Sequence, residues 1–591
     1  MSNINAIRHL LPRFHIRYER NKQRSSLELS SNIFAFVIIA VAFVFIAWGT
    51  KEMSAPISNL KSEPINLDPI NLITYSLRTM LRMLIAVIFS LMFTFIYASL
   101  AAKNYLLEKV LVPFLDILQS VPILGYISFT VTAFLALFPG SIMGAECAAI
   151  FAIFTSQVWN MTFSFYRSLK SIPEDLEAAA NIFRMSSWQK FWRMEVPYGI
   201  PSLVWNMVVS MSGGWFFVVA SEVITIGNNK LTLPGIGSYI ALALEQKNIP
   251  AIFYAIMAMI SIIILYDQLL LRPLIAWSNK FKYEMTAGGK APTSWLLTLF
   301  QKSLIIKKLF SPISHIARFI LYLPIFNKQS NNINIIKPQR TGDNGAWLSY
   351  LFYATLFSTL ILACYYLFNF LHNFIGWYEV AKVFVLALIT LLRVILLIIL
   401  ASIFWVPIGI YIGQHPKLSE IIQPIAQLVA AFPVNLLFPG VFIIITHYKL
   451  DANIWLSPLM IMGTQWYILF NVIAGSASFP NDLKEVIANF NIKGWLWWRK
   501  IMLPAVIPYF ITGAITASGG AWNASIVAEV ITYGDKKIIA TGLGSYIAEM
   551  TVKADFHRII LGIIMMSLFV VLLNRFFWQP LYDYSNKKFQ L

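Results

Sequence analysis

The chain repeats itself at long range, and this repeat constrains the fold more than any other feature. Eight landmark residues recur 307 positions later: Trp188, Pro197, Pro201, Trp215, Glu222, Gly227, Gly235 and Gly237 return as Trp495, Pro504, Pro508, Trp522, Glu529, Gly534, Gly542 and Gly544. Three earlier residues, Arg82, Pro113 and Pro122, return 311 positions later as Arg393, Pro424 and Pro433. A shift that stays nearly constant over about 200 residues indicates a duplicated domain, with one copy of the same function in each half.

The composition places both copies in a membrane. Apolar residues make up 58% of the chain and charged residues 12%, against about 45–50% and 25% in soluble domains. The apolar runs are continuous, as in membrane-spanning helices. We therefore predict an all-α integral membrane protein of about twelve spans, arranged as two homologous six-helix domains. The predicted spans are 32–49, 81–102, 111–137, 145–166, 202–224, 251–272, 347–370, 383–413, 422–447, 455–476, 506–532 and 559–578.

The net charge of +18 reflects membrane topology rather than nucleic-acid binding. Lys and Arg are concentrated before the first predicted span and in the segment between the halves, which is the positive-inside pattern of cytoplasmic segments. An even number of spans places both termini in the cytoplasm. The predicted domains are a basic N-terminus (1–31), a first membrane domain (32–281), an amphipathic linker on the inner leaflet (282–346) and a second membrane domain (347–591).

One loop of each half has a helix-start signal. Pro173 precedes Glu174-Asp175-Leu176-Glu177, and Pro480 precedes the corresponding segment of the second copy. Proline followed by acidic residues favours a helix start. Each loop continues through Trp188 or Trp495 to Pro197 or Pro504, before the next predicted span. The topology places both loops in the cytoplasm, as a short helix, a turn and a second helix.

These loops resemble the EAA loop of permease subunits in binding-protein-dependent ABC importers. That loop has Glu-Ala-Ala, a central Gly, and Leu-Pro about twenty residues after the Glu. In this chain Glu177, Ala178 and Ala179 begin the first copy, 20 residues before Pro197. Glu485 begins the second, 19 residues before Pro504, with Val486 and Ile487 in place of the two alanines. The resemblance covers most of both halves.

Both copies depart from the pattern at the glycine. Arg184 occupies that position in the first copy and Asn491 in the second. A turn that needs positive φ is strained more by Arg than by Asn. We therefore expect two unequal docking sites. A brace between neighbouring spans is the alternative interpretation of either loop alone, and the duplication argues against it.

The resemblance implies a set of partners. In the family the loop helix docks on an ATPase, so two loops imply two copies of a cytoplasmic ABC ATPase that carry the ATP and magnesium. It also implies a periplasmic substrate-binding protein, a bacterial inner (plasma) membrane location with surrounding lipid, and no cofactor on this chain. The residues carried over to the ATPase-coupling loops are Glu177, Ala178, Ala179, Trp188, Pro197, Glu485, Ile487, Trp495 and Pro504.

Matched acidic and basic residues stand near the predicted external ends of the spans. Glu222 and Glu529 close the fifth span of each half. A carboxylate at membrane depth favours a functional role on the solute pathway. A helix-end carboxylate satisfied by backbone N–H groups is the equal alternative. Arg82 and Arg393 are expected to snorkel to the interface rather than to contact solute.

Small and aromatic residues inside the fifth spans are the remaining pathway candidates. They are Trp215, Trp522 and Asn523, beside paired glycines, and core packing is the safer interpretation. Gly235-Ile236-Gly237 and Gly542-Leu543-Gly544 are predicted to be external turns facing the binding protein. With Ala521-Trp522-Asn523-Ala524, the last of these most resembles the nitrate, sulfonate, taurine and bicarbonate permeases, although amino-acid and betaine permeases share parts of it.

The sequence lacks the residue patterns of several kinds of functional site. The sequence contains no Gly-x-x-x-x-Gly-Lys-Ser/Thr, so the chain is not expected to be its own ATPase. No metal-ligand cluster or nucleophile constellation stands out in the sequence, and we expect no enzyme activity. The rival functions are a secondary transporter driven by an ion gradient, which would also contain repeats, and a non-transporting membrane scaffold.

Overall fold

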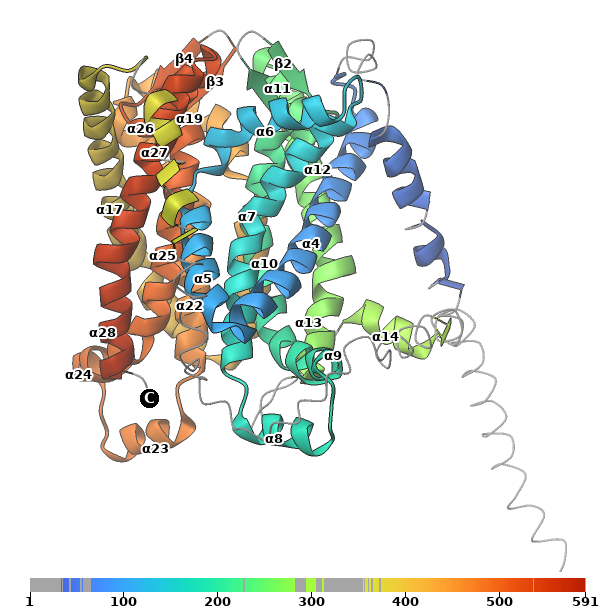
Figure 1. Ribbon diagram of the computed structural model, residues 1–591, viewed down its shortest axis with the longest axis vertical. Coiled ribbons are helices and arrows are strands. Elements are labelled where there is room, and N and C mark those ends of the chain that lie inside the picture. Colours follow the sequence, from blue (N-terminus) through green and yellow to red (C-terminus); the bar gives the residue numbers. More distant parts are fainter. Residues whose placement is uncertain are drawn as a thin grey trace, which may run out of the picture. The chain divides into compact units, whose positions relative to one another are not determined.

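A computed structural model describes residues 65–226, 229–281, 374–534 and 536–589, together with short stretches between 33 and 56, 294 and 303, 311 and 312, and 354 and 370. The predicted N-terminal segment 1–31 and most of the linker 282–346 lie outside the described residues. The chain divides into two compact units: unit 1 comprises 1–52, 167–205 and 265–335, and unit 2 comprises 53–166, 206–264 and 336–591. Figure 1 shows the elements by label.

The first half is a series of helices interrupted by one hairpin. In order, the elements are α4 (Asn71–Lys103), α5 (Tyr105–Ser120), α6 (Ile123–Leu137), α7 (Met143–Lys170), α8 (Glu174–Ile182), α9 (Ser187–Lys190), the π-helix η1 (Phe191–Glu195), α10 (Val196–Ser221), β1 (Val223–Ile226), β2 (Asn229–Thr232), α11 (Ile236–Glu245), α12 (Ile249–Tyr266), the π-helix η2 (Asp267–Leu271), α13 (Arg272–Ser278) and η3 (Asn279–Phe281). Helix α14 (Trp295–Lys302) follows.

The second half repeats the order. Its elements are α17 (Trp377–Gln414), α18 (Pro416–Ala431), η6 (Val434–Leu437), α19 (Phe438–Tyr448), α20 (Ala452–Trp455), α21 (Ser457–Met462), α22 (Gln465–Ala477), α23 (Asn481–Asn489), α24 (Gly494–Trp497), the π-helix η7 (Trp498–Met502), α25 (Leu503–Ala528), β3 (Val530–Tyr533), β4 (Lys536–Ile539), α26 (Leu543–Val552), α27 (Phe556–Leu573), the π-helix η8 (Asn574–Trp578) and α28 (Gln579–Phe589). Even the π-helices recur, so the duplication extends to irregular features.

The described part of the chain does not confirm twelve membrane spans. Among the described residues, seven helices are long and apolar enough to cross a membrane, and nine if each of two bent helix pairs counts as one span. The bent pairs are Pro416–Ala431 with Val434–Tyr448, at 72°, and Ala452–Met462 with Gln465–Ala477, at 44°. The predicted span 111–137 is broken into α5 and α6 next to Pro122, which cannot continue a hydrogen-bonded helix. Of the predicted span 347–370, the structure describes 354–355, 357–359, 361–362 and 365–370, all as helix.

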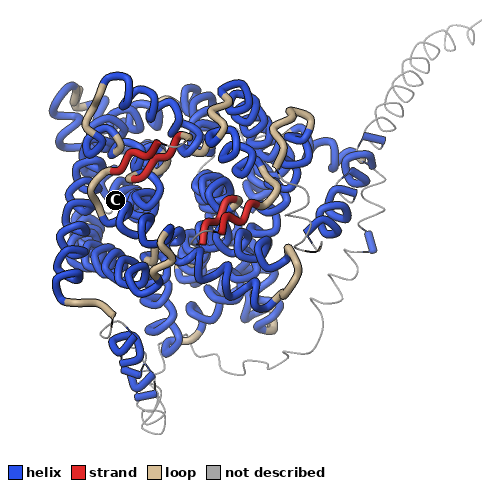
Figure 2. Tube along the Cα trace, turned by 90° about the horizontal axis from the view of Figure 1, so that it is seen from above, coloured by secondary structure: helices blue, strands red, loops and turns tan. Residues whose placement is uncertain are grey.

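The fold is mostly helical rather than all-α, because two antiparallel hairpins interrupt it. Val223 pairs with Thr232 in the first and Val530 with Ile539 in the second. The β-branched run Val223-Ile224-Thr225-Ile226 favours a strand directly after a helix. Both hairpins lie at the same end of unit 2, at the top of Figure 1 and drawn red in Figure 2.

The two halves are packed against each other within unit 2. Helix α6 of the first half contacts α25, α26 and α27 of the second, and β1 contacts α26 while β3 contacts α11. The largest buried cluster centres on α25, where Trp522 is 1% exposed. Between membrane helices, close packing of this kind stabilises through van der Waals contact rather than through removal of apolar surface from water. The seam between the halves is therefore part of the folded core.

Candidate functional site

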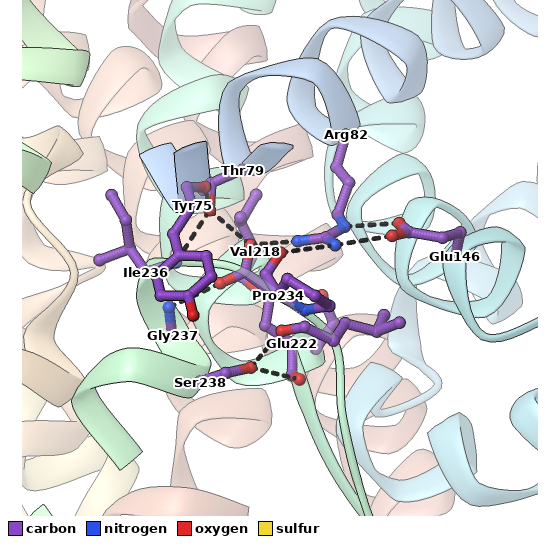
Figure 3. A network of polar contacts seen from close by, with 12 residues as sticks. Tyr75, Thr79, Arg82, Glu146, Val218, Glu222, Pro234, Ile236, Gly237 and Ser238 are labelled. Carbon is purple, nitrogen blue, oxygen red and sulfur yellow. Dashed lines mark hydrogen bonds and ion pairs between the residues drawn. The ribbon is translucent and has the colours of Figure 1, made fainter. Parts of the chain in front are cut away.

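The carboxylate of Glu222 is buried at the end of α10 and has several hydrogen-bond partners (Figure 3). The hydroxyl of Thr79 donates to it at 2.6 Å and Arg82 Nη1 at 2.7 Å. The backbone N–H of Gly237, at the start of α11, donates to it at 2.6 Å. A buried charge is tolerated when it is paired and hydrogen-bonded in this way.

Arg82 binds two carboxylates at once. Its Nε and Nη2 donate to the two oxygens of Glu146 at 2.6 and 2.7 Å, and Nη2 also donates to the carbonyl of Pro234 at 2.9 Å. The guanidinium is 0% exposed. This planar fork suits bidentate carboxylate binding. The prediction that Arg82 snorkels to the membrane interface is therefore wrong, because the ion pair draws it inward.

The second half has an equivalent cluster. Arg393 Nη1 donates to Glu529 at 2.9 Å, and the hydroxyl of Thr390 donates to the same oxygen at 3.0 Å. The backbone N–H of Ser545 donates to Glu529 at 2.9 Å. Glu529 is as buried as Glu222, but the Arg393 side chain is 12% exposed. The repeat thus places a threonine, an arginine and a glutamate at matching positions.

The two clusters differ by one charge. Glu146 of the first half corresponds to Asn453, 307 positions later. Asn453 accepts from Arg393 Nη2 at 3.3 Å and from the backbone N–H of Thr541 at 2.8 Å. One guanidinium therefore faces two carboxylates in the first half, but one carboxylate and one amide in the second. The first cluster carries a net negative formal charge and the second is neutral.

The paired glycines are explained by these carboxylates. A Cβ on Gly235 would lie 2.2 Å from the Glu222 carboxyl carbon, and one on Gly542 would lie 2.3 Å from the Glu529 oxygens. Both glycines cap the start of buried helices, α11 and α26. The segments predicted to be turns therefore begin helices, and their place on the external face stays a prediction. The glycines allow the helix start to close over the carboxylate.

The pathway candidates of the fifth spans lie in different environments. Trp215 and Trp522 are buried in α10 and α25. Asn523 bridges the halves, because its Oδ1 accepts from the backbone N–H of Ile123 at 2.7 Å. That N–H is one of the donors left without a partner at the start of α6. Asn523 therefore fastens α25 to the first turn of α6.

The loop of the first half forms the predicted helix in unit 1. Helix α8 begins directly after Pro173, and Glu177 forms an ion pair with Lys190 of α9 at 3.1 Å. Ala178 is exposed and Ala179 half-buried. Ser186 and Gln189 form a capping box at α9, next to Trp188. Pro197 then stands in the first turn of α10.

The loop of the second half forms the equivalent helix in unit 2. Helix α23 follows Pro480, and its Glu485 is exposed, while Ile487 packs on the core of unit 2. Trp495 of α24 is largely exposed, unlike half-buried Trp188, and Pro504 opens α25. The two loops have equivalent helices, but their matching side chains lie in different environments.

The two loop glutamates, Glu177 and Glu485, do not occupy equivalent positions of the repeat. The turns after α8 and α23 contain Arg184 at φ 50° and Asn491 at φ 51°, and these residues are 307 apart. With that shift, Glu485 matches Ala178, and Glu177 matches Lys484. One residue turns the side chain by about 100° around a helix. The glutamates consequently point in different directions from their helices.

The same turns expose an aromatic pair that sequence reasoning missed. Phe183 is 73% exposed and Phe490 is 75% exposed, at positions again 307 apart. Each stands one residue before the positive-φ turn. The repeat itself was the available signal, since both copies keep Phe at this position. An apolar ring held in the open by a fixed turn is typical of a binding surface.

Replacing Arg184 with glycine is expected to stabilise the protein more than replacing Asn491 does. Left-handed backbone costs an ordinary residue roughly 1–2 kcal/mol, and Asn tolerates it better. Arg184→Gly should therefore raise the melting temperature of the detergent-purified protein, and Asn491→Gly should raise it less. Equal shifts for the two variants would show that the turns carry equal strain.

The sequence matches a known family twice. The pattern of the binding-protein-dependent transport system inner membrane component matches residues 95–271 and 405–579. Together the matches cover more than half of the chain. The boundaries include both loops, both glycine segments and both buried glutamates, and therefore agree with the structural repeat.

Individual relatives are similar to part of the chain. A nitrate import permease protein, NrtB, of Leptolyngbya laminosa is 27% identical over 185 residues, 31% of this chain and 63% of the relative. Bicarbonate transport system permease proteins, CmpB, of Synechococcus elongatus and Synechocystis sp. are 27% and 28% identical, each over 30% of this chain and 60% of the relative. The chain thus spans less than two thirds of the length of these relatives.

The chain is a multi-pass inner membrane protein with two permease domains. This follows from the double family match, the long apolar helices and the repeated order of elements. The expectation of a transport component rather than an enzyme is confirmed by the same match. The chain belongs to the family of inner membrane components of binding-protein-dependent transport systems, and it carries the domain of that family twice.

Proposed function

We propose that the chain is the complete transmembrane permease of an ATP-driven ABC importer, which moves a small solute across the bacterial inner membrane. The observation that carries this proposal is the double family match within one chain. Two permease domains in one chain supply what two separate subunits would otherwise assemble. The domain limits 32–281 and 347–591 and the linker 282–346 belong to the same proposal, as do twelve spans with both termini in the cytoplasm.

Each loop is proposed to dock one ATPase subunit, which would carry ATP and magnesium. Support comes from the exposed surfaces of α8 and α23, where Glu177 and Glu485 lie beside the Phe183 and Phe490 turns. Ala178, Ala179, Trp188 and Pro197 belong to the first docking site. Ile487, Trp495 and Pro504 belong to the second. Because the glutamates are offset by one residue, the two contacts differ.

The solute is proposed to be a small anion delivered by a periplasmic binding protein. The supporting relatives are named for nitrate import and bicarbonate transport. Asn523 is proposed to face the pathway at the seam. Glu222, Glu529, Trp215 and Trp522 are proposed to hold the external ends of α10 and α25 in place.

The proposal is tested by reconstituting the chain in proteoliposomes with the ATPase and binding protein encoded beside it. ATP-dependent, vanadate-sensitive uptake is expected. Uptake that follows an ion gradient without ATP would support a secondary transporter instead, and ATPase-free purification under mild conditions would argue against any ABC function.

In the same assay, Glu177→Gln and Glu485→Gln are expected to reduce ATP-dependent uptake unequally. Glu177 is tied to Lys190 and has less freedom to meet a partner, whereas exposed Glu485 is free to do so. A severalfold larger loss is therefore expected for Glu485→Gln. The matched control is Glu549→Gln, which removes a similar exposed ion pair, to Lys553 at 2.8 Å, away from the loops. Identical losses for the two loop variants would show that the docking sites are equivalent.

A further inference from the structure

The seam between the halves contains a partly open cavity of about 100 Å³ within unit 2. Helices α5, α7 and α10 of the first half and α21, α22 and α25 of the second supply most of its walls. Water occupies about 30 Å³ per molecule in the liquid, so the cavity holds only a few water-sized groups. A solute of four or five heavy atoms has the appropriate size.

Three amide or phenol side chains line this cavity without a hydrogen-bond partner in the described part of the chain. They are the amides of Gln119 and Asn160 and the phenol of Tyr467. Hydroxyls such as that of Thr516 instead donate to a carbonyl of their own helix, here Thr512 at 3.1 Å. All three side chains are half-buried. The three unpaired groups are therefore available to a ligand.

Two of these groups occupy matching positions of the repeat. Asn160 and Tyr467 are 307 residues apart, so the duplicated wall presents an amide from one half and a phenol from the other. Gly213 makes room for the phenol, because a Cβ on Gly213 would lie 2.8 Å from the Tyr467 oxygen. The polar groups have thus diverged while the wall that holds them has been kept.

Gly519 sets the free width of the cavity. It lines the wall on α25, and a Cβ built on it would meet nothing within 4 Å. Neighbouring Gly520 is different, because its Cβ would lie 2.4 Å from Thr464. Gly519 therefore leaves space that no neighbouring side chain fills, and any larger residue there would narrow the cavity.

All lining residues are uncharged. The unpaired groups include N–H and O–H donors, which match the acceptor oxygens of an oxyanion. Passage requires binding that is favourable enough for entry yet weak enough for release. Neutral donors meet this requirement, because they hold an anion without the strong attraction of a fixed cation.

We propose that this cavity is a transit site for a small oxyanion, bound by Gln119, Asn160 and Tyr467 and limited in size by Gly519. The proposal rests on the proposed permease function and adds the place and the donors. It differs from a packing void, which would leave transport unaffected when its lining changes.

The test uses the full chain with its ATPase and binding protein in proteoliposomes, with labelled nitrate and labelled bicarbonate as separate probes. Tyr467→Phe and Asn160→Leu are expected to lower uptake of the transported anion by about tenfold, the usual effect of losing a hydrogen bond to a charged group. Gly519→Val is expected to abolish uptake by filling the cavity. ATP hydrolysis and assembly should remain at wild-type levels in all three variants.

Matched controls separate the cavity from general effects on the helices. Tyr378→Phe removes an exposed phenol, and Gly440→Val changes an exposed helical glycine with open space around it. Both should transport normally. Wild-type uptake by Tyr467→Phe and Gly519→Val would overturn the transit site and leave the permease function standing.

A wild-type complex that hydrolyses ATP but carries neither nitrate nor bicarbonate would overturn the proposed oxyanion class. Absence of any ATPase assembly would instead contradict the permease proposal itself. The two failures are therefore distinguishable by hydrolysis and assembly alone.

Discussion

Replacing Arg82 with methionine is expected to prevent the accumulation of folded protein. The substitution leaves Glu146 and Glu222 buried without their shared cation. Removing one partner of a buried ion pair costs about 3–5 kcal/mol, and two carboxylates lose theirs here. This loss is a large part of the roughly 5–15 kcal/mol that stabilises a typical domain. The yield of monodisperse protein in detergent and its thermal unfolding measure the effect.

Two further variants make the result specific. Arg393→Met should be milder, because Arg393 is partly exposed and faces only one carboxylate. Glu146→Asn should be milder still, since it gives the first cluster the groups that the second cluster has at Asn453. A melting temperature for Arg82→Met equal to that of the wild type would show that the buried ion pairs contribute nothing to stability.

Replacing Gly544 with alanine is the second change expected to have a large effect. A Cβ at this position would lie 2.4 Å from the carbonyl of Ser525 and 2.8 Å from the backbone nitrogen of Ile526. Those atoms belong to the backbone of α25 and cannot rotate away as a side chain can. Overpacking a core usually costs about 1–3 kcal/mol, and a backbone clash lies at the upper end or beyond.

The expected result for Gly544→Ala is a clear fall in melting temperature and in uptake. Gly237→Ala should behave similarly, because its Cβ would lie 2.3 Å from the carbonyl of Val219. Gly376→Ala is the control: this glycine precedes α17, and its Cβ would meet nothing within 4 Å. If Gly544→Ala unfolded at the same temperature as Gly376→Ala, close helix contact would not be the reason for the glycine pattern.

The repeat and its landmarks could be predicted from the sequence because they depend on local signals. Pro173 and Pro480 indicate helix starts from the local sequence alone. The positive φ of Arg184 and Asn491 follows from the expected glycine turn. Apolar runs predict helices in the same local way. The outline of both halves therefore needed no knowledge of tertiary contacts.

The clusters could not be predicted because their partners are remote in sequence. Arg82 is 64 residues from Glu146 and 140 from Glu222. Its own predicted span, taken alone, indicates a place at the membrane interface. The break at Pro122 and the bends in the second half also escaped, because hydropathy does not distinguish a straight span from a bent pair. Pairing and bending are set by packing, which hydropathy does not report.

The hydrogen bond from the Ile123 N–H to Asn523 makes the two halves of the chain non-interchangeable. The residue that matches Asn523 in the first half is Phe216, and the residue that matches Ile123 is Val434. Phe216 has no amide with which to fasten the opposite helix start. A pair of two first halves would lose this link on both sides, and it would also contain the negatively charged cluster twice. The two halves of the chain are therefore unlike domains, and each depends on the other for its contacts.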